Sequence, residues 1–246
     1  MVPGPYTAPM TVLLIGDSLT AGNLGIPYAR HIDLPPDTRI RNFGRDGDTV
    51  RGVRSRLAET LAAESPDIVV LQVGANDVLI PAMVRLGGPW PDFADRMRAV
   101  GAIPTPDPKA FEQEYRALVA AAGDWGVGGL VCVTAPPVGE DLNSTVNRER
   151  IEINRIIRTV AEDGAAVLAD AAEVLESELR ALPLISDWFF DSPERFAADV
   201  RRIRREKGAS RLSEERGLYL TMDGAHLNER GAALMGRVVG QAIAAI

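Results

Sequence analysis

The feature that most constrains the fold is a set of short apolar runs that alternate with amphipathic segments. Three of the runs, VLLI, IVVLQV and LVCV, are almost continuously hydrophobic, which is typical of strands buried on both faces of a parallel sheet. The run within RIRNF mixes charged and apolar residues, so we place it at an edge. The five predicted strands cover residues 10–15, 39–42, 68–73, 130–134 and 166–169.

Segments with helical periodicity separate these runs, at residues 51–64, 111–122, 148–162 and 228–246. Alternation of strands and helices implies right-handed crossovers and a parallel sheet covered by helices on both faces. Two stretches, 80–108 and 182–220, fit the alternation poorly. We interpret them as insertions at the rim of a single domain that spans residues 1–246.

Composition narrows the class of protein. With 246 residues and 46% hydrophobic residues, the chain can bury a core of globular size. Its net charge of −7 argues against a nucleic-acid partner, whose binding surface is basic. The single cysteine, Cys132, cannot form an intramolecular disulfide and is expected in the core. No run approaches the ~20 apolar residues of a membrane span, and the N-terminus MVPGPYTAPM lacks a charged segment typical of signal peptides. We therefore expect a cytoplasmic protein.

Polar residues follow three of the predicted strands. Gly16-Asp17-Ser18 comes after the first, NFGRDGDT after the second and GAND, which contains Asn76, after the third. Because ligands collect beyond the carboxyl ends of parallel strands, a serine, a glycine turn and an amide are predicted to converge. Taken alone, Ser18 would be interpreted as a helix N-cap, so its role depends on partners elsewhere.

One of the two histidines offers such a partner. His226 lies in DGAHLNERG, three residues after Asp223, and this spacing lets a single turn bring the carboxylate to Nδ1 of the ring. The order Ser18, Asp223, His226 matches one of the known catalytic-triad orders, although GDSLT is not the G-x-S-x-G nucleophile elbow. His31 has no such partner in the sequence and is expected at the surface.

Acyl transfer by a serine also requires donors for the oxyanion. The Ser18 backbone N–H and the Asn76 amide are candidates, although Asn76 could instead bond the backbone of its own turn. A third donor is expected from the glycine turn after the second strand. Turn chemistry alone does not distinguish Gly44 from Gly47.

Taken together, these blocks resemble those of the SGNH hydrolases, also called GDSL esterases and lipases. The matching blocks are GDSL at 16–19, a glycine that the family's G-D-T pattern assigns to Gly47, GAND at 74–77 and DGAH at 223–226. The resemblance implies a three-layer α/β/α sandwich with a flavodoxin-like central parallel sheet of about five strands. It also implies a small-molecule ester substrate, no metal and no organic cofactor. The roles it implies are Ser18 as nucleophile, His226 as base, Asp223 as the residue that orients the base, and Ser18, Gly47 and Asn76 as oxyanion donors.

The leading hypothesis is a serine hydrolase that cleaves carboxylic esters through an acyl-enzyme on Ser18. The same triad would serve a carbohydrate O-deacetylase or a thioesterase. A different class is a flavodoxin-like module that binds phosphate or another anion at the start of the first helix. That alternative gives no role to Asn76 or to the pair of Asp223 and His226.

The second insertion carries two further features. Trp188, Phe189 and Phe190 either line an acyl pocket or form a lid, or they are buried within their own insertion, which we favour. The basic run RRIRREK, at residues 201–207, is interpreted as the solvated face of an amphipathic helix, because Phe196, Val200 and Ile203 keep helical spacing beside it.

Overall fold

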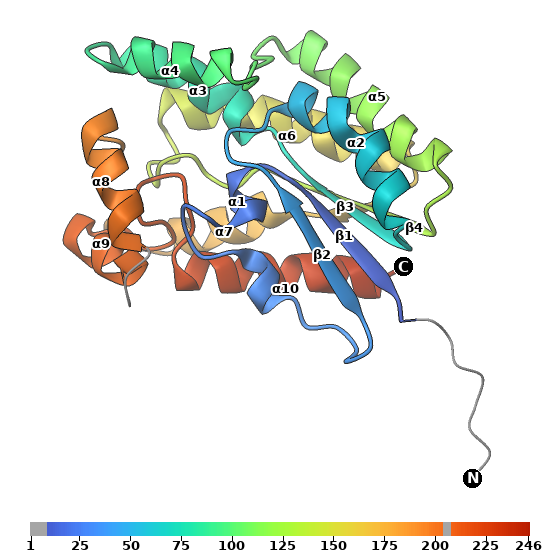
Figure 1. Ribbon diagram of the computed structural model, residues 1–246. Helices are drawn as coiled ribbons and strands as arrows, with labels where there is room; N and C mark the ends of the chain where they lie inside the picture. Colours follow the sequence, from blue (N-terminus) through green and yellow to red (C-terminus); the bar gives the residue numbers. More distant parts are fainter. Residues whose placement is uncertain (1–8, 204–207) are drawn as a thin grey trace.

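A parallel sheet forms the centre of the computed structural model, which describes residues 9–203 and 208–246. Its strand order is β2-β1-β3-β4-β5, and all neighbouring strands are parallel (Figure 1). The sequence prediction of five strands is confirmed, and β2 lies at an edge as expected. The strands are β1 (Thr11–Gly16), β2 (Arg39–Gly44), β3 (Ile68–Gln72), β4 (Gly129–Val133) and β5 (Val167–Ala169).

Helices cover both faces of the sheet and give the predicted three layers. The α-helices are α1 (Ser18–Ala21), α2 (Val50–Glu64), α3 (Ala75–Leu86), α4 (Trp90–Ala99), α5 (Pro108–Asp124), α6 (Thr145–Asp163), α7 (Ala171–Arg180), α8 (Pro193–Ile203), α9 (Gly208–Arg216) and α10 (Glu229–Ala244), and a 3₁₀ helix spans Tyr28–His31. Figure 1 shows α2, α5 and α6 on one side of the sheet and α7 and α10 on the other.

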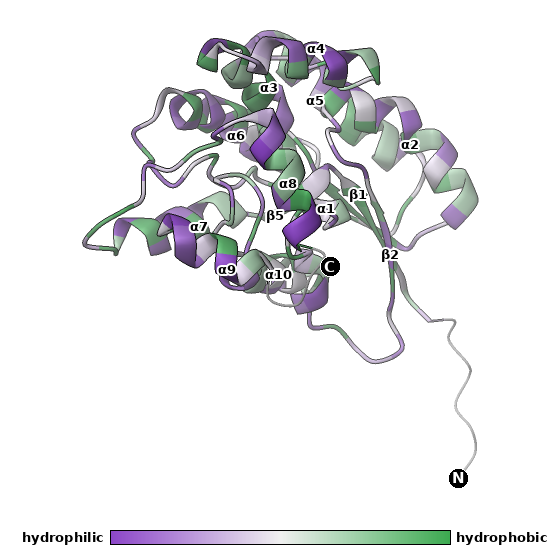
Figure 2. Ribbon diagram, turned by 60° about the vertical axis from the view of Figure 1, so that its left-hand side comes forward, coloured by the Kyte–Doolittle hydropathy of each residue, from purple (hydrophilic) through white to green (hydrophobic). Residues whose placement is uncertain are grey.

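The two hydrophobic clusters follow the alternation of side chains along each strand. Leu13 and Ile15 of β1 join the cluster beneath α2, α3, α5 and α6. Val12 and Leu14 join the opposite cluster, beneath α7 and α10. This two-sided burial explains why the strand sequences are continuously apolar, and Cys132 in β4 is buried among them as expected. Figure 2 shows the complementary pattern on helices such as α2 and α4, where hydrophilic and hydrophobic turns alternate.

The two rim segments flank the carboxyl ends of the strands. The first, 80–108, begins inside α3 and includes α4; the second, 182–220, includes α8 and α9. Figure 1 shows α4 and α8 on the same side of the molecule, beyond the strand ends. In α8, Phe196 and Val200 are half-buried and Arg201 is exposed, which fits the amphipathic interpretation. Residues 204–207 of the basic run, and residues 1–8 of the N-terminal segment, lie outside the described residues.

Candidate active site

Ser18 is placed by the abrupt end of β1. The strand ends at Gly16 and α1 begins at Ser18, with Asp17 between them as the N-cap. Oδ1 of Asp17 accepts from the Leu19 backbone N–H at 2.9 Å, so the capping role that Ser18 could have played belongs to its neighbour. The Ser18 hydroxyl is therefore left for another partner, and its Oγ lies 3.1 Å from Nε2 of His226.

A tight turn between Thr221 and Leu227 brings the acid and the imidazole together. These two residues form an antiparallel bridge, and Oδ1 of Asp223 accepts from the His226 backbone N–H at 2.7 Å. The other oxygen, Oδ2, lies 2.7 Å from Nδ1 of the ring. Because an ionised carboxylate only accepts hydrogen bonds, Nδ1 carries the proton and Nε2 is left as the acceptor that faces Ser18.

The electrostatics of this turn favour a more basic imidazole. Burial alone would lower the pKa of His226, but the charge and hydrogen bond of Asp223 oppose it, with smaller contributions from Asp17 and Asp46. The result is a pKa raised above the usual 6.5. An imidazole with a raised pKa is a stronger base for the Ser18 proton.

Asn76 and Gly47 face the same cavity as Ser18 and His226. Asn76 is the second residue of α3, and its Nδ2 donates to the Asp48 backbone oxygen at 2.9 Å. It therefore bonds the neighbouring glycine turn and not its own, and the second hydrogen of the amide remains available. Gly47 adopts a φ of 81°, a left-handed conformation that glycine accommodates without strain.

The two glycines that turn chemistry left open have different surroundings. A Cβ at Gly44 would collide with the backbone N of Ala21 in α1, so this glycine permits close packing of α1 on the end of β2. Gly47 instead lines the cavity. Within the described residues, neither the Ser18 nor the Gly47 backbone N–H donates to a protein acceptor, which leaves both N–H groups available to a ligand.

Two fully buried carboxyl groups support the loops around the cavity. Asp77 accepts from the Val50 backbone N–H at 3.0 Å and from Thr105 at 2.8 Å, so it joins the start of α2 to the segment before α5. Asp17 also accepts from the Gln72 amide at 3.2 Å. Burial raises the pKa of Asp17 and of Asp77 to about 7.

Glu140 is a polar residue that the sequence analysis missed. It lies far from the triad in the sequence, yet its buried carboxylate accepts four hydrogen bonds from the segment that precedes Asp223. Oε1 accepts from the Leu220 N–H at 2.7 Å and from the Thr221 N–H and Oγ1, both at 2.9 Å, and Oε2 accepts from the Tyr219 N–H at 2.7 Å. No local motif marks this residue, because its partners are backbone groups about 80 positions away.

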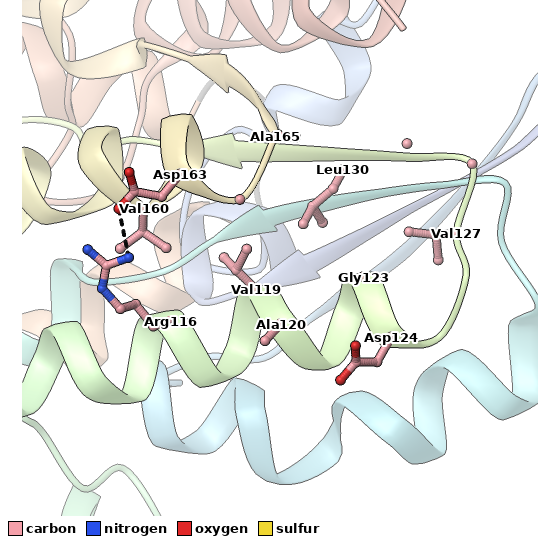
Figure 3. A pocket seen from close by; sticks show the side chains of 13 residues that line it. Arg116, Val119, Ala120, Gly123, Asp124, Val127, Leu130, Val160, Asp163 and Ala165 are labelled. Atoms are coloured by element: carbon pink, nitrogen blue, oxygen red, sulfur yellow. Dashed lines mark hydrogen bonds and ion pairs between the residues drawn. The ribbon is translucent and has the colours of Figure 1, made fainter.

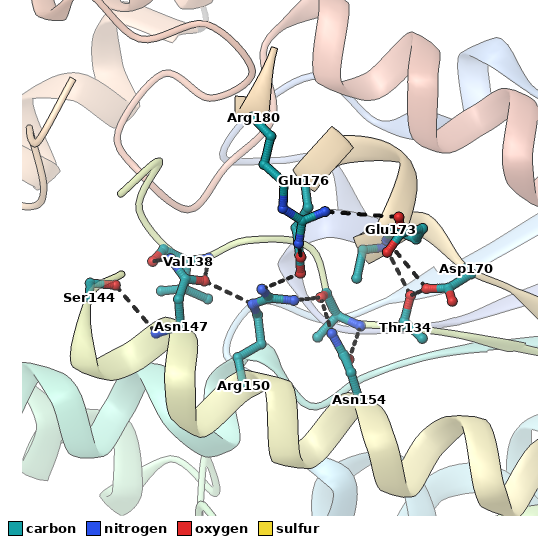
Figure 4. A network of polar contacts seen from close by, with 12 residues as sticks. Thr134, Val138, Ser144, Asn147, Arg150, Asn154, Asp170, Glu173, Glu176 and Arg180 are labelled. Atoms are coloured by element: carbon teal, nitrogen blue, oxygen red, sulfur yellow. Dashed lines mark hydrogen bonds and ion pairs between the residues drawn. The ribbon is translucent and has the colours of Figure 1, made fainter. Parts of the chain in front are cut away.

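The segment that carries Glu140 is itself held by α6 (Figure 4). The Asn154 side chain exchanges two hydrogen bonds with the Ala135 backbone, and Asn147 bonds the Val138 backbone in the same way. Arg150 lies between them, donates to Ala135 and forms a buried ion pair with Glu176 at 2.6 Å. Glu140 therefore joins the triad-bearing turn to a rigid part of the core.

The cavity beside Ser18 has a volume of about 210 Å³. Apart from the catalytic candidates, most of its lining is apolar and comes from α3, α4, α8 and the residues just before α8. A larger cavity of about 510 Å³ lies between α5 and α6 at the amino ends of β4 and β5 (Figure 3). Its Arg116 is paired with Asp163 at 2.8 Å, and it contains no serine, histidine or cysteine. The chemistry therefore points to the smaller cavity.

Over 9–203 and 208–246, no group of three or more histidine, cysteine, aspartate or glutamate side chains is placed to hold a metal ion. Over the same ranges, no helix is both long enough and apolar enough to cross a membrane.

Comparison with known proteins agrees with this geometry. A sequence model of the GDSL-like Lipase/Acylhydrolase family matches residues 14–234. The chain is 35% identical to Esterase TesA of Pseudomonas aeruginosa over 106 residues, which are 39% of this chain and about half, 52%, of that protein. It is 23% identical over 190 residues to an acetylxylan esterase of Geobacillus stearothermophilus, covering 70% of this chain and 80% of that one.

Solved structures share the fold at low sequence identity. The crystal structure of Axe2, an acetylxylan esterase from Geobacillus stearothermophilus, superposes with a TM-score of 0.65 at 19% identity, covering 98% of this chain and 96% of that chain. LAE5, described as an α/β hydrolase enzyme from the metagenome of Lake Arreo in Spain, gives a TM-score of 0.62 at 19% identity, covering 98% and 95%. Since the family match spans most of the sequence, the chain belongs to the GDSL-like lipase/acylhydrolase family.

Proposed function

We propose that the protein hydrolyses carboxylic esters through an acyl-enzyme formed on Oγ of Ser18. The observation that carries this proposal is the continuous line of hydrogen bonds from Ser18 to His226, at 3.1 Å, and from His226 to Asp223, at 2.7 Å. A hydroxyl is a poor nucleophile until an adjacent base takes its proton. Here the base faces the hydroxyl, and a carboxylate fixes the orientation of the base.

In the acylation step, Ser18 Oγ attacks the ester carbonyl carbon while its proton passes to Nε2 of His226. The carbonyl oxygen becomes an oxyanion, and the Ser18 N–H, the Gly47 N–H and the Asn76 amide donate hydrogen bonds to it. The tetrahedral intermediate then collapses, the bond to the alkoxy oxygen breaks, and the proton on Nε2 passes to the departing alcohol. Asp223 stabilises the imidazolium throughout and keeps its own charge.

In the deacylation step, water replaces the alcohol. His226 takes a proton from the water, the resulting hydroxide attacks the acyl carbon, and the same three donors bind the oxyanion. Collapse of this second intermediate returns the proton to Ser18 and releases the carboxylic acid. We further propose that this chemistry takes place on small-molecule esters, within a single domain over residues 1–246 with rim insertions at 80–108 and 182–220.

The alternative of an anion-binding module has little support in this arrangement. α1 is only four residues long, so its dipole is weak. The carboxyl group of Asp17 caps its N-terminus, where a bound phosphate would have to lie. A deacetylase or a thioesterase would use the same triad, and these alternatives differ from the main proposal in the substrate that the cavity accepts.

A fluorophosphonate probe tests the nucleophile directly, because it forms a covalent adduct with an activated serine. We expect stoichiometric labelling of the wild-type protein and no labelling of Ser18→Ala, together with loss of ester hydrolysis. Ser55→Ala is the matched control, since Ser55 lies exposed on α2 and bonds only its own helix; it should label like the wild type. Full labelling of Ser18→Ala would refute the assignment.

A further inference from the structure

We infer that the cavity beside Ser18 is an acyl-chain site for straight-chain acyl groups of about six to eight carbons. The inference rests on the proposed function, because it names the acyl group that Ser18 carries. Such a cavity would select medium-chain acyl esters over esters of acetic acid.

The lining of the cavity is suited to hydrocarbon. Beyond the triad and oxyanion residues, Asp46 is the only charged side chain among the described residues that line it. The apolar walls come in pairs from three places in the chain: Leu79 and Met83 from α3, Phe93 and Met97 from α4, and Phe190 and Phe196 from the second rim segment. An apolar cavity with few polar partners remains unfavourable for water, so it gains most from an apolar ligand.

The geometry assigns the cavity to the acyl group and not to the alcohol. Asn76 begins the wall, and Leu79 and Met83 continue it along the same face of α3 at spacings of three and seven residues. The acyl chain is one of the two substituents on the carbon whose oxygen Asn76 would bind, so it starts beside this residue. It also stays on Ser18 through both half-reactions, whereas the alcohol needs a path out.

The size of the cavity sets the chain length. An apolar cavity of about 150 Å³ accommodates benzene, which corresponds to about 25 Å³ for each carbon. At that density the 210 Å³ here holds about eight carbons, including the carbonyl carbon at the mouth. An acetyl group would fill about a quarter of this space and leave the apolar walls without contacts.

Aromatic contacts and a buried ion pair hold the wall formed by α8 and the residues before it. The Phe196 ring lies 6.0 Å from the His226 ring and 5.8 Å from Phe190, and Phe190 packs against Trp90 at 5.6 Å. α8 is fastened by a buried ion pair between Asp199 and Arg216. Because these contacts hold the wall in place, the volume of the cavity sets the chain length, and chains much longer than eight carbons should bind less well.

The direct test is a series of p-nitrophenyl esters from acetyl to palmitoyl. Each methylene that enters the cavity is expected to raise kcat/KM by up to about three- to fourfold, so octanoyl should exceed acetyl by at least tenfold. For decanoyl and longer esters, kcat/KM should fall again. A flat profile, or one with its maximum at acetyl, would overturn the inference.

A substitution at the far end of the cavity provides the second arm. Met83 lies about 10 Å along α3 from Asn76, so Met83→Phe shortens the cavity without touching the oxyanion site. We expect the octanoyl-to-acetyl ratio of kcat/KM to fall at least tenfold. Val84→Phe is the matched control, because Val84 is the next residue on the same helix and is 36% exposed; its ratio should equal the wild-type ratio. Equal loss at all chain lengths in Met83→Phe would count against the site.

Fluorophosphonate labelling separates failure of this inference from failure of the proposed function. If Ser18 is labelled and esters are hydrolysed but the ratio is unaffected by Met83→Phe, the acyl site is wrong and the triad stands. If neither labelling nor hydrolysis occurs in folded wild-type protein, the proposed function itself is wrong, and the acyl site falls with it. Circular dichroism and a thermal melt of each variant show that the comparison is between folded proteins.

Discussion

The segment that carries Asp223 and His226 is expected to depend on Glu140, which touches neither of them. Its carboxylate accepts all four hydrogen bonds described above from the backbone and hydroxyl of residues 219–221. Glu140→Gln keeps the shape of the side chain but replaces one acceptor oxygen with an amide NH₂ group. With the amide NH₂ in the Oε2 position one backbone N–H faces a donor, and with it in the Oε1 position two do.

The magnitude follows from that count of bonds. With the amide oxygen in the Oε1 position, three bonds remain but lose their charge, and the bond from Tyr219 is lost. A hydrogen bond to a charged group is worth about 1.5–3 kcal/mol, and part of the loss is offset because a neutral amide costs less to bury. We therefore expect the free energy of unfolding to fall by about 2 kcal/mol, which lowers Tm by roughly 4–8 °C in a domain of this size.

The effect on activity should exceed what the stability loss explains. A displacement of a catalytic group by about 1 Å can cost about 10²-fold, so we expect kcat for Glu140→Gln to fall about 10- to 100-fold at a temperature where the variant is fully folded. KM should change little, because Glu140 does not line the cavity. The acid limb of the pH–rate profile should move down toward 6.5 as the contact between His226 and Asp223 loosens.

The measurements are steady-state kinetics, a pH–rate profile and a thermal melt, with Glu162→Gln as the control. Glu162 is exposed on α6, so the control removes the same charge without removing buried hydrogen bonds. A drop in Tm with unchanged kcat and an unchanged acid limb would reduce Glu140 to a purely structural residue. Identical behaviour of the two variants in every assay would refute the reasoning altogether.

Three further predictions concern the site itself. Asp223→Asn should lower kcat by about 10⁴-fold and move the acid limb to lower pH, because the Asp223 charge raises the pKa of His226; an unmoved limb in the pH–rate profile contradicts this. Asn76→Ala should lower kcat by about 10²–10³-fold with little change in KM, and a loss below threefold in steady-state kinetics removes it as an oxyanion donor. Burial raises the pKa of Asp17 to about 7, so the native state holds a proton that the unfolded chain releases between about pH 4 and 7, and stability falls as the pH rises through that range. Urea unfolding at about pH 5 and pH 8 should show a smaller decline for Asp17→Asn, and an equal decline would exclude Asp17 as its source.

The sheet could be predicted from the sequence because its strands are buried on both faces. Continuous apolar runs such as VLLI have no interpretation as exposed strands, and the mixed residues of RIRNF allowed only an edge position. α3 was harder to predict, because Pro81 lies inside it and proline normally argues against a helix interior. The stretch 80–108, rich in proline and glycine, is interpreted as an insertion from its sequence, although α3 begins at residue 75 and continues to residue 86.

The residues of the site also differ in how well the sequence alone predicts their contacts. Asp223 and His226 are three residues apart and share one turn, so their spacing predicted their contact. Glu140 and Phe196 reach the site only through the tertiary fold. Glu140 bonds backbone N–H groups, which every non-proline residue offers, so no residue type at a fixed spacing signals it. Phe196 was assigned correctly to a helix, but the sequence does not show that this helix packs on His226.

The turn that carries Asp223 and His226 is held from two sides, by Glu140 and by Arg216. On the core side, Glu140 holds residues 219–221, and α6 holds the segment of Glu140. On the rim side, Arg216 donates to the backbone oxygen of Met222 at 2.7 Å while it pairs with Asp199 of α8. The same helix supplies Phe196 to the acyl cavity. A change in α8 that reshapes the cavity therefore also acts on Met222, the residue next to Asp223. Substitutions in α8 should shift both the acyl-chain preference and the pKa of His226. Substitutions in the part of α3 that lines the cavity should shift the acyl-chain preference alone.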